Sequence, residues 1–290
     1  MVMRDYLLRL QVNRRRDWPR MDISSGRSSV KDLIKTHQFR EVFYLFLSRS
    51  FSKEVDRTFL QSLFEVSNSL QVSLRDIEET NLARGKKLLK SFCNEIRGAD
   101  EEAVIGDLAR QYAFLFLGVG SENVALCESA YRNEGGLLFQ NAYFDILEKY
   151  KEIGLGKRED FPEPEDHLSL ELAYMAHLSR RIISSIETGK EEEAKKYYQY
   201  QGSFLNDHLL LWVPQFAKSL SEITSSPFYK ASAYLLEGYI KIDVELLDSL
   251  LPAVAAKKAV SRRKPKEPER REGDKKKLKG KKKHATIGSC

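Results

Sequence analysis

Apolar residues recur three or four positions apart over most of the chain, which is the spacing of one face of an α-helix. From Ser28 onward this spacing predicts successive helices, the first of them capped by Ser28 or Ser29. The apolar positions of the first three predicted helices are Leu33, Ile34, Phe39, Phe43, Phe46 and Leu47; Phe59, Leu60, Leu63, Phe64 and Val66; and Leu82, Leu88, Leu89 and Phe92, ending near Gly98. Alternation with a period of two residues is not sustained, so no strand is predicted and the fold class is all-α.

Further helices are predicted over Asp107–Leu117 and Asn141–Tyr150. The first of these carries Leu108, Tyr112, Leu115 and Phe116 on one face. Gly118 is expected to end it, because glycine reaches positive φ without a steric penalty. The last helix is predicted to begin at Pro227 and to stop at Pro252, since proline lacks the N–H that continues a helix.

Residues 161–167, which we call the acidic elbow, combine two prolines with three acidic residues directly before an apolar-periodic helix. Pro162 and Pro164 each fix φ and hold the preceding residue extended. Asp166 is predicted to be the N-cap of that helix, accepting a hydrogen bond from a backbone N–H near Ser169. The helix should bury the single face formed by Leu168, Leu172, Met175, Ile182 and Ile186.

Three segments carry a family resemblance. Glu163-Pro-Glu-Asp-His-Leu-Ser-Leu-Glu-Leu172 resembles the signature Glu-Pro-x-Asp-His-(Ile/Leu)-x-x-Glu-Leu of the TorD/DmsD family of cytoplasmic molybdoenzyme-maturation chaperones. Tyr112-Ala-Phe-Leu-Phe-Leu-Gly-Val-Gly, followed by Glu128-Ser-Ala-Tyr, is similar to the family's Tyr-x-x-Leu-Phe-x-Gly-Pro-Gly and Glu-Ser-x-Tyr, with Val119 in place of the usual proline. His208-Leu-Leu-Leu-Trp-Val-Pro-Gln-Phe216 resembles its His-x-x-x-Trp-x-Pro-x-Phe.

The resemblance implies a single-domain helical bundle that is a chaperone and not an enzyme. It implies binding to the twin-arginine signal peptide, and to the apo form, of a molybdopterin-containing oxidoreductase catalytic subunit before export. It also implies a cytoplasmic monomer or domain-swapped dimer. We predict the domains as a basic N-terminal arm over 1–27, the chaperone domain over 28–251, and a Lys-rich disordered tail over 252–290.

An arginine-bearing, apolar peptide needs carboxylates beside an apolar groove, because guanidinium pairs bidentately with carboxylate. Asp166 is the predicted main arginine partner, with His167 orienting it. The remaining candidate signal-peptide contacts are Glu163, Pro164, Glu171, Tyr112, Phe116, Gly118 and Trp212. Each apolar member of this set is equally able to be a core residue. His208 is predicted to be a hydrogen-bonded core residue, and Pro214 to force a break or kink just after the face that His208 and Trp212 share.

Other chemistries find little support in the residues. The Gly118-Val-Gly loop follows a helix and lacks the strand and third glycine of a dinucleotide fingerprint. His167, Glu171 and His208 are a weak basis for a metal site, and the three cysteines lack ligand spacing, so no metal and no cofactor are predicted. No apolar run is long enough to span a membrane, and Arg14–Arg16 are not followed by the apolar region of a secretory signal.

The charge is divided unevenly along the chain. Residues 1–20 hold six arginines and two aspartates, and residues 257–284 hold 15 Lys+Arg against 4 Asp+Glu. Because the total is +6, the residues between them carry −9. The tail has almost nothing to bury. Two interpretations stay open for it: a solubilising tail, or weak attraction to nucleic acid, ribosomes or anionic surfaces. A nucleic-acid- or ribosome-associated protein acting through this tail is the alternative function.

Overall fold

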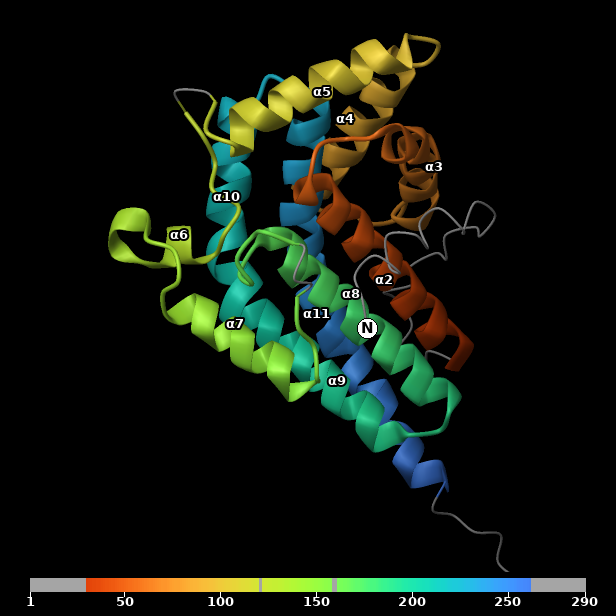
Figure 1. Cartoon of the computed structure of the whole chain (residues 1–290). Coiled ribbons are helices and arrows are strands. Elements are labelled where there is room, and N and C mark those ends of the chain that lie inside the picture. Colours follow the sequence, from red (N-terminus) through yellow and green to blue (C-terminus); the bar gives the residue numbers. More distant parts are fainter. Residues whose placement is uncertain (1–29, 120–121, 158–160, 262–290) are drawn as a thin grey trace, which may run out of the picture.

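The structure of the chain is a computed structural model that describes residues 30–119, 122–157 and 161–261. Most helices follow one another with short turns between them, whereas longer connections join α5 to α6 and α7 to α8 (Figure 1). Within these ranges the β-type pairing is a single bridge between Cys127 and His167, so the prediction of an all-α fold is confirmed. None of the helices in the described ranges combines the length and hydropathy that a membrane crossing requires.

The elements largely occupy the predicted positions. In chain order they are α2 (Val30–Ser52), α3 (Arg57–Ser73), α4 (Thr80–Glu95), α5 (Glu101–Phe116), α6 (Ser129–Arg132), the short η1 (Glu134–Gly136), α7 (Asn141–Glu152), α8 (Leu168–Glu187), α9 (Glu191–Phe204), the π-helical turn η2 (Leu205–Leu209), α10 (Leu210–Ile223) and α11 (Pro227–Ser261). The predicted caps Ser28 and Ser29, the basic arm and residues 262–290 of the predicted tail lie outside the described residues.

The helix that follows the acidic elbow, α8, lies at the centre of the bundle. It makes its most extensive contacts with α2 and also packs against α9, and Figure 1 shows α2 and α8 side by side. The prediction of a single buried face is too narrow. Besides Leu168 and Leu172, the polar Ser169 and Glu171 are fully buried, so α8 is enclosed on most sides.

A buried polar cluster ties four helices together. Arg40 of α2 makes a bidentate ion pair with Asp243 of α11, with N–O distances of 2.6 and 2.7 Å. Its guanidinium also donates to the side-chain oxygen of Gln201 in α9, and Gln201 donates to the Met175 carbonyl of α8 at 3.1 Å. Tyr44 donates to Asp243 at 2.6 Å. Because each charge is paired and hydrogen-bonded, burial is tolerated and the helix arrangement is specified.

Helices α4 and α11 cross closely through glycine. A Cβ on Gly85 would lie 2.8 Å from the backbone nitrogen of Leu235 and 3.0 Å from the carbonyl oxygen of Ala231. A Cβ on Gly238 would meet the backbone nitrogen of Leu82 on α4. Each helix therefore offers a glycine where the other's backbone approaches, and no side chain fits at either position.

Two predictions about prolines are wrong. Pro252 does not end the last helix, because α11 continues to Ser261. The φ of proline is itself helical, so proline removes one hydrogen bond, and the helix formers that follow it (Ala-Val-Ala-Ala-Lys-Lys) favour continuation. The break predicted just after Trp212 is absent, because α10 runs from Leu210 through Pro214 to Ile223. The irregularity comes before it, as the π-helical turn η2, which widens the helix ahead of the proline ring.

Candidate functional site

The acidic elbow is held against residues 126–129 by backbone hydrogen bonds. The amide of Leu168 donates to the Leu126 carbonyl at 2.7 Å, and the amide of Glu128 donates to the Asp166 carbonyl at 3.0 Å. The amide of His167 also donates to the Pro164 carbonyl at 3.1 Å, which closes the turn after the prolines. The elbow is therefore clamped on one side by a segment far away in sequence and on the other by its own proline turn.

The N-cap of α8 is His167, so the prediction that Asp166 caps this helix is wrong. His167 has an extended backbone, and its Nδ1 accepts from the Ser169 amide at 3.2 Å and lies 2.8 Å from the Ser169 hydroxyl. Asp166 instead accepts from the Ser129 amide through Oδ2 at 2.9 Å. The side chain of Asp166 turns away from α8 because the clamping segment offers it that backbone donor.

Three carboxyl groups meet at the start of α8, all of them fully buried: Glu128, Asp166 and Glu171. Glu128 pairs with Arg132 at 2.6 Å and with His208 Nδ1 at 2.9 Å. In the described part of the chain, no ion pair joins Asp166 or Glu171 to a cation. The site is therefore richer in buried acid than in buried base.

Two carboxyl oxygens at this site have no donor within hydrogen-bond distance among the described residues, Asp166 Oδ1 and Glu171 Oε1. The other oxygen of Glu171 accepts from Trp212 Nε1 at 3.1 Å. Burial raises the pKa of Glu171 well above its ordinary value, and the neighbouring Glu128 adds to this, while the Trp212 hydrogen bond opposes it. An incoming donor or cation would relieve both oxygens.

His208 and Trp212, which belong to the third motif, contact two of the three buried carboxyl groups. His208 is 2% exposed and hydrogen-bonded to Glu128, which confirms that it is a core residue with a polar partner. Its ring stacks on Phe204 with 4.8 Å between centroids. Trp212 is fully buried, and its indole packs on Tyr131 at 5.2 Å. Residues from all three motifs therefore converge at the N-terminus of α8.

Glu163 and Pro164 lie at the surface of the elbow, where both are partly exposed. Lys157 donates to the Glu163 carbonyl at 2.6 Å and lies 3.5 Å from the Glu165 carboxylate. The reachable acid of the elbow is thus Glu163 and Glu165, whereas Asp166 and His167 are enclosed behind them.

Tyr112, Phe116 and Gly118 lie at the C-terminal end of α5 rather than on the elbow. Tyr112 is buried and donates to the Phe51 carbonyl at 3.2 Å, and Gly118 has the expected positive φ of 69°. A row of ring contacts nevertheless links them to Trp212. Its steps run from Tyr112 to Phe116, to Phe51, to Phe216 and to Trp212, with centroids 5.0 to 6.3 Å apart.

A family model for the nitrate reductase delta subunit matches residues 78–218. Over 164 residues the chain is 34% identical to the chaperone protein TorD of Photobacterium profundum, an alignment that covers 56% of this chain and 74% of that protein. It is 30% identical over 221 residues to the chaperone protein TorD of Shewanella loihica, covering 74% and 96% of the two chains. This chain belongs to the TorD/DmsD family of molybdoenzyme chaperones. The role of a TorD chaperone is non-catalytic, which confirms the prediction that the chain is not an enzyme.

The site includes three residues that the candidate set lacked, Glu128, Ser129 and Arg132, and all three lie in the stretch that the family model matches. Glu128 and Ser129 belong to the Glu-Ser-x-Tyr part of the second motif, which was the sequence signal that could have identified them as site residues. No local pattern indicates that the segment clamps the elbow, since the hydrogen bond from Ser129 to Asp166 spans 37 positions.

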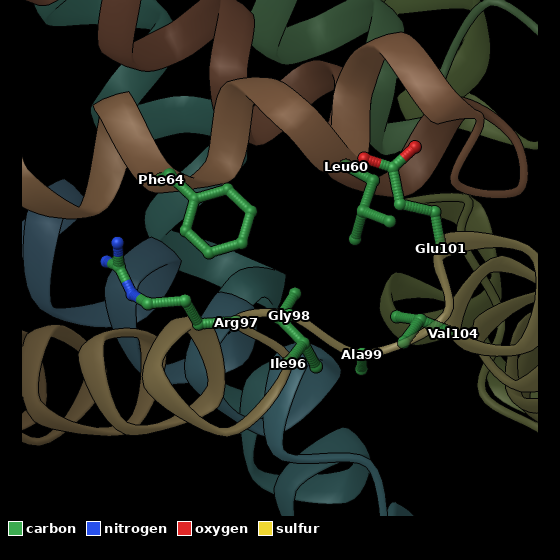
Figure 2. A pocket seen from close by; sticks show the side chains of 8 residues that line it. All are labelled: Leu60, Phe64, Ile96, Arg97, Gly98, Ala99, Glu101 and Val104. Atoms are coloured by element: carbon green, nitrogen blue, oxygen red, sulfur yellow. The ribbon is translucent and has the colours of Figure 1, made fainter.

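A pocket of about 260 Å³ lies away from this candidate site, between α3 and the turn that joins α4 to α5. Figure 2 shows Arg97 and Phe64 at one end and Glu101 and Leu60 at the other. None of its lining residues belongs to the candidate set. Across the described residues, no group of three or more His, Cys, Asp or Glu side chains has the arrangement of a metal site.

Proposed function

We propose that this chaperone binds the twin-arginine signal peptide of a molybdopterin-containing oxidoreductase subunit in the cytoplasm, while that client is still in its apo form. The cofactor belongs to the client, and the chaperone delays export until it is loaded. Membership of the TorD/DmsD family supports the class of client. The acidic elbow supports the peptide chemistry, because an arginine pair requires carboxylates held in place.

The observation that carries this proposal is the pair of buried carboxyl oxygens without donors, Asp166 Oδ1 and Glu171 Oε1. A buried acceptor without a partner costs about 1–3 kcal/mol, and more when the group is charged. A guanidinium supplies up to five N–H donors and a positive charge. A leader arginine that reaches these oxygens therefore gains charge-assisted hydrogen bonds and relieves an existing cost.

Because Asp166 is enclosed, binding requires the elbow to open. An arginine first meets the partly exposed Glu163 and Glu165, where it competes with Lys157 for the Glu165 carboxylate. A planar guanidinium binds a carboxylate bidentately, whereas the lysine ammonium acts as a point charge. Separation of the elbow from residues 126–129 then exposes Asp166, because its backbone carbonyl and its carboxylate are both hydrogen-bonded to that segment.

The remaining candidate residues have supporting roles in this proposal. His167 caps α8 and so holds Asp166 at the helix start, and Pro164 stiffens the turn. Trp212 fixes Glu171 through its indole N–H. Tyr112, Phe116 and Gly118 stay predictions as peptide contacts, reached along the aromatic row that ends at Trp212.

The test is isothermal titration calorimetry with an Arg-Arg leader peptide on the wild type and on Asp166→Asn. The asparagine keeps the shape and can still accept from the Ser129 amide, so we expect the melting temperature to be unchanged or higher. Loss of the charge should weaken binding by about one to two decades, corresponding to about 1.5–3 kcal/mol. A Lys-Lys leader serves as the charge-matched control and should bind the wild type more weakly than the Arg-Arg leader.

Equal affinity of wild type and Asp166→Asn for the Arg-Arg leader would remove Asp166 as the arginine partner. If the wild type bound neither leader, the proposed function itself would be wrong.

A further inference from the structure

Four large apolar side chains stand exposed within eight residues, three at the turn between η1 and α7 and one in the first turn of α7. Leu137 is 61% exposed, Leu138 42%, Phe139 54% and Phe144 56%. We call these four residues the apolar rim. In Figure 1 the α6–η1–α7 segment lies at the edge of the molecule. Isolated surface leucines are common, but a run of this kind is typical of an interaction surface.

The backbone of the apolar rim is strained at its centre. Phe139 has a φ of 57°, the one positive φ of a non-glycine residue in the described ranges. An aromatic residue rarely adopts this conformation, and its ring here is not held there by burial. Strain of this kind concentrates at binding surfaces and indicates that the conformation serves the exposed ring.

The apolar rim is joined to the acidic elbow through α7. The Phe139 and Phe144 rings both contact Tyr143, with centroid distances of 5.0 and 5.3 Å. Partial burial raises the pKa of Tyr143, and hydrogen bonding to Glu165 raises it further. Two turns later, Tyr150 donates to the Glu165 carbonyl at 3.2 Å. Helix α7 thus carries Phe144 of the rim, directly follows the other three rim residues, and contacts Glu165 of the elbow through Tyr143 and Tyr150.

We propose that the apolar rim receives the apolar segment of the leader whose arginines bind the elbow. This inference rests on the proposed function. It assigns the apolar stretch of the leader to the four residues of the apolar rim, which have no other role in the candidate site. The juxtaposition favours this occupant. A leader presents an arginine pair directly followed by an apolar stretch, and the chaperone presents partly exposed carboxylates at Glu163 and Glu165 beside exposed leucine and phenylalanine. A second copy of the chain would cover the rim but would leave the acidic half of the surface without a complement.

The test uses fluorescence anisotropy with two labelled peptides, the full Arg-Arg leader and the same peptide without its apolar stretch. The variant is Phe139→Gly combined with Phe144→Ser. Glycine accepts the positive φ at position 139, so the double variant should fold at least as stably as the wild type. The full leader should bind it about tenfold more weakly than the wild type, while the affinity for the short peptide stays unchanged.

The matched control is Val72→Ser on α3, which removes a side chain that is 63% exposed on a different helix. It should bind both peptides as the wild type does. If the double variant keeps full affinity for the complete leader, the rim is not its site, although the proposed function stands. If the wild type binds neither peptide, the proposed function fails, and the inference with it. If the double variant instead turns a wild-type dimer into a monomer and leader binding stays the same, the rim is a contact between copies and the inference is wrong.

Discussion

His167 shows how burial determines the chemistry of one side chain at the elbow. Its Nδ1 accepts the Ser169 amide at 3.2 Å, which requires that nitrogen to be unprotonated. Burial lowers the pKa of His167 from 6.5 to about 4, so the ring is neutral at physiological pH. The imidazole of His167 therefore caps α8 through Nδ1 in its neutral state.

Acidification should destabilise the fold through His167. Because the folded pKa is depressed, this stabilisation is complete above pH 6.5 and is lost as the pH falls towards 4. Between these two pH values the unfolded chain binds the proton and the folded chain does not. The full shift corresponds to on the order of 3 kcal/mol, about 2 kcal/mol of it by about pH 5. Urea unfolding at about pH 7 and pH 5 measures this loss. His167→Asn keeps a good N-cap without a titrating ring, so its loss should be smaller by that amount. The same loss in both proteins would exclude His167 as the titrating group.

The motif places Asp166 and His167 at the elbow from sequence alone, but it does not predict which of the two caps α8. Both precede Leu168, and both carry an acceptor that can reach an N-terminal amide. Which residue caps the helix depends on Ser129, whose amide donates to the Asp166 carboxylate. Long-range partners of this kind leave no trace in local spacing, so the burial of the site was not predicted either.

At the scale of helices, the crossing of α4 and α11 depends on glycine. Gly85→Ala places a methyl group against the backbone of α11, 2.8 Å from the Leu235 nitrogen, and backbone cannot move aside as a flexible side chain can. We expect a loss of about 1–3 kcal/mol or more in the free energy of unfolding, because overpacking forces the helices apart. Denaturant titration measures this loss.

Gly202→Ala on α9 is the matched control. A Cβ there meets no atom within 4 Å, so the substitution should stabilise the protein by about 0.5–1 kcal/mol through helix propensity. Equal effects at the two positions would mean that helix propensity, rather than the close crossing, determines the role of Gly85.

Apolar spacing predicts the helices well because most of them bury a face of the expected period, as α5 does with Leu108, Tyr112 and Leu115. It does not predict which helices pair. The bidentate contact of Arg40 with Asp243 joins positions 203 residues apart, and each of these side chains alone resembles a solvated surface charge. The apolar rim escaped prediction for a related reason. In the local sequence nothing distinguishes Leu137 and Phe144 from apolar residues of the core, and only the three-dimensional arrangement leaves them exposed.

At the scale of the whole molecule, opposite charges are separated along the chain. Residues 21–256 carry a net −9 within a chain of net +6, so the helical body and its elbow are acidic. An acidic body attracts an arginine-bearing leader over distances of about a Debye length. The basic segment that begins at Lys257 would instead attract polyanions, which makes the two partner classes separable by deletion.

Deletion of residues 262–290, which follow the last residue of α11, tests this separation. It removes 13 Lys+Arg and 4 Asp+Glu, so the net charge changes from +6 to −3. If the tail binds polyanions, the full chain should be retained on nucleic acid with an affinity that falls steeply with salt, by a slope of about 0.7–0.9 per phosphate contact, and the shortened chain should not. Affinity for the Arg-Arg leader should stay within about twofold, because the elbow and the apolar rim lie on the helical body. Loss of leader binding would place the tail in client recognition, whereas equal retention of both chains on nucleic acid would remove the tail as the polyanion site.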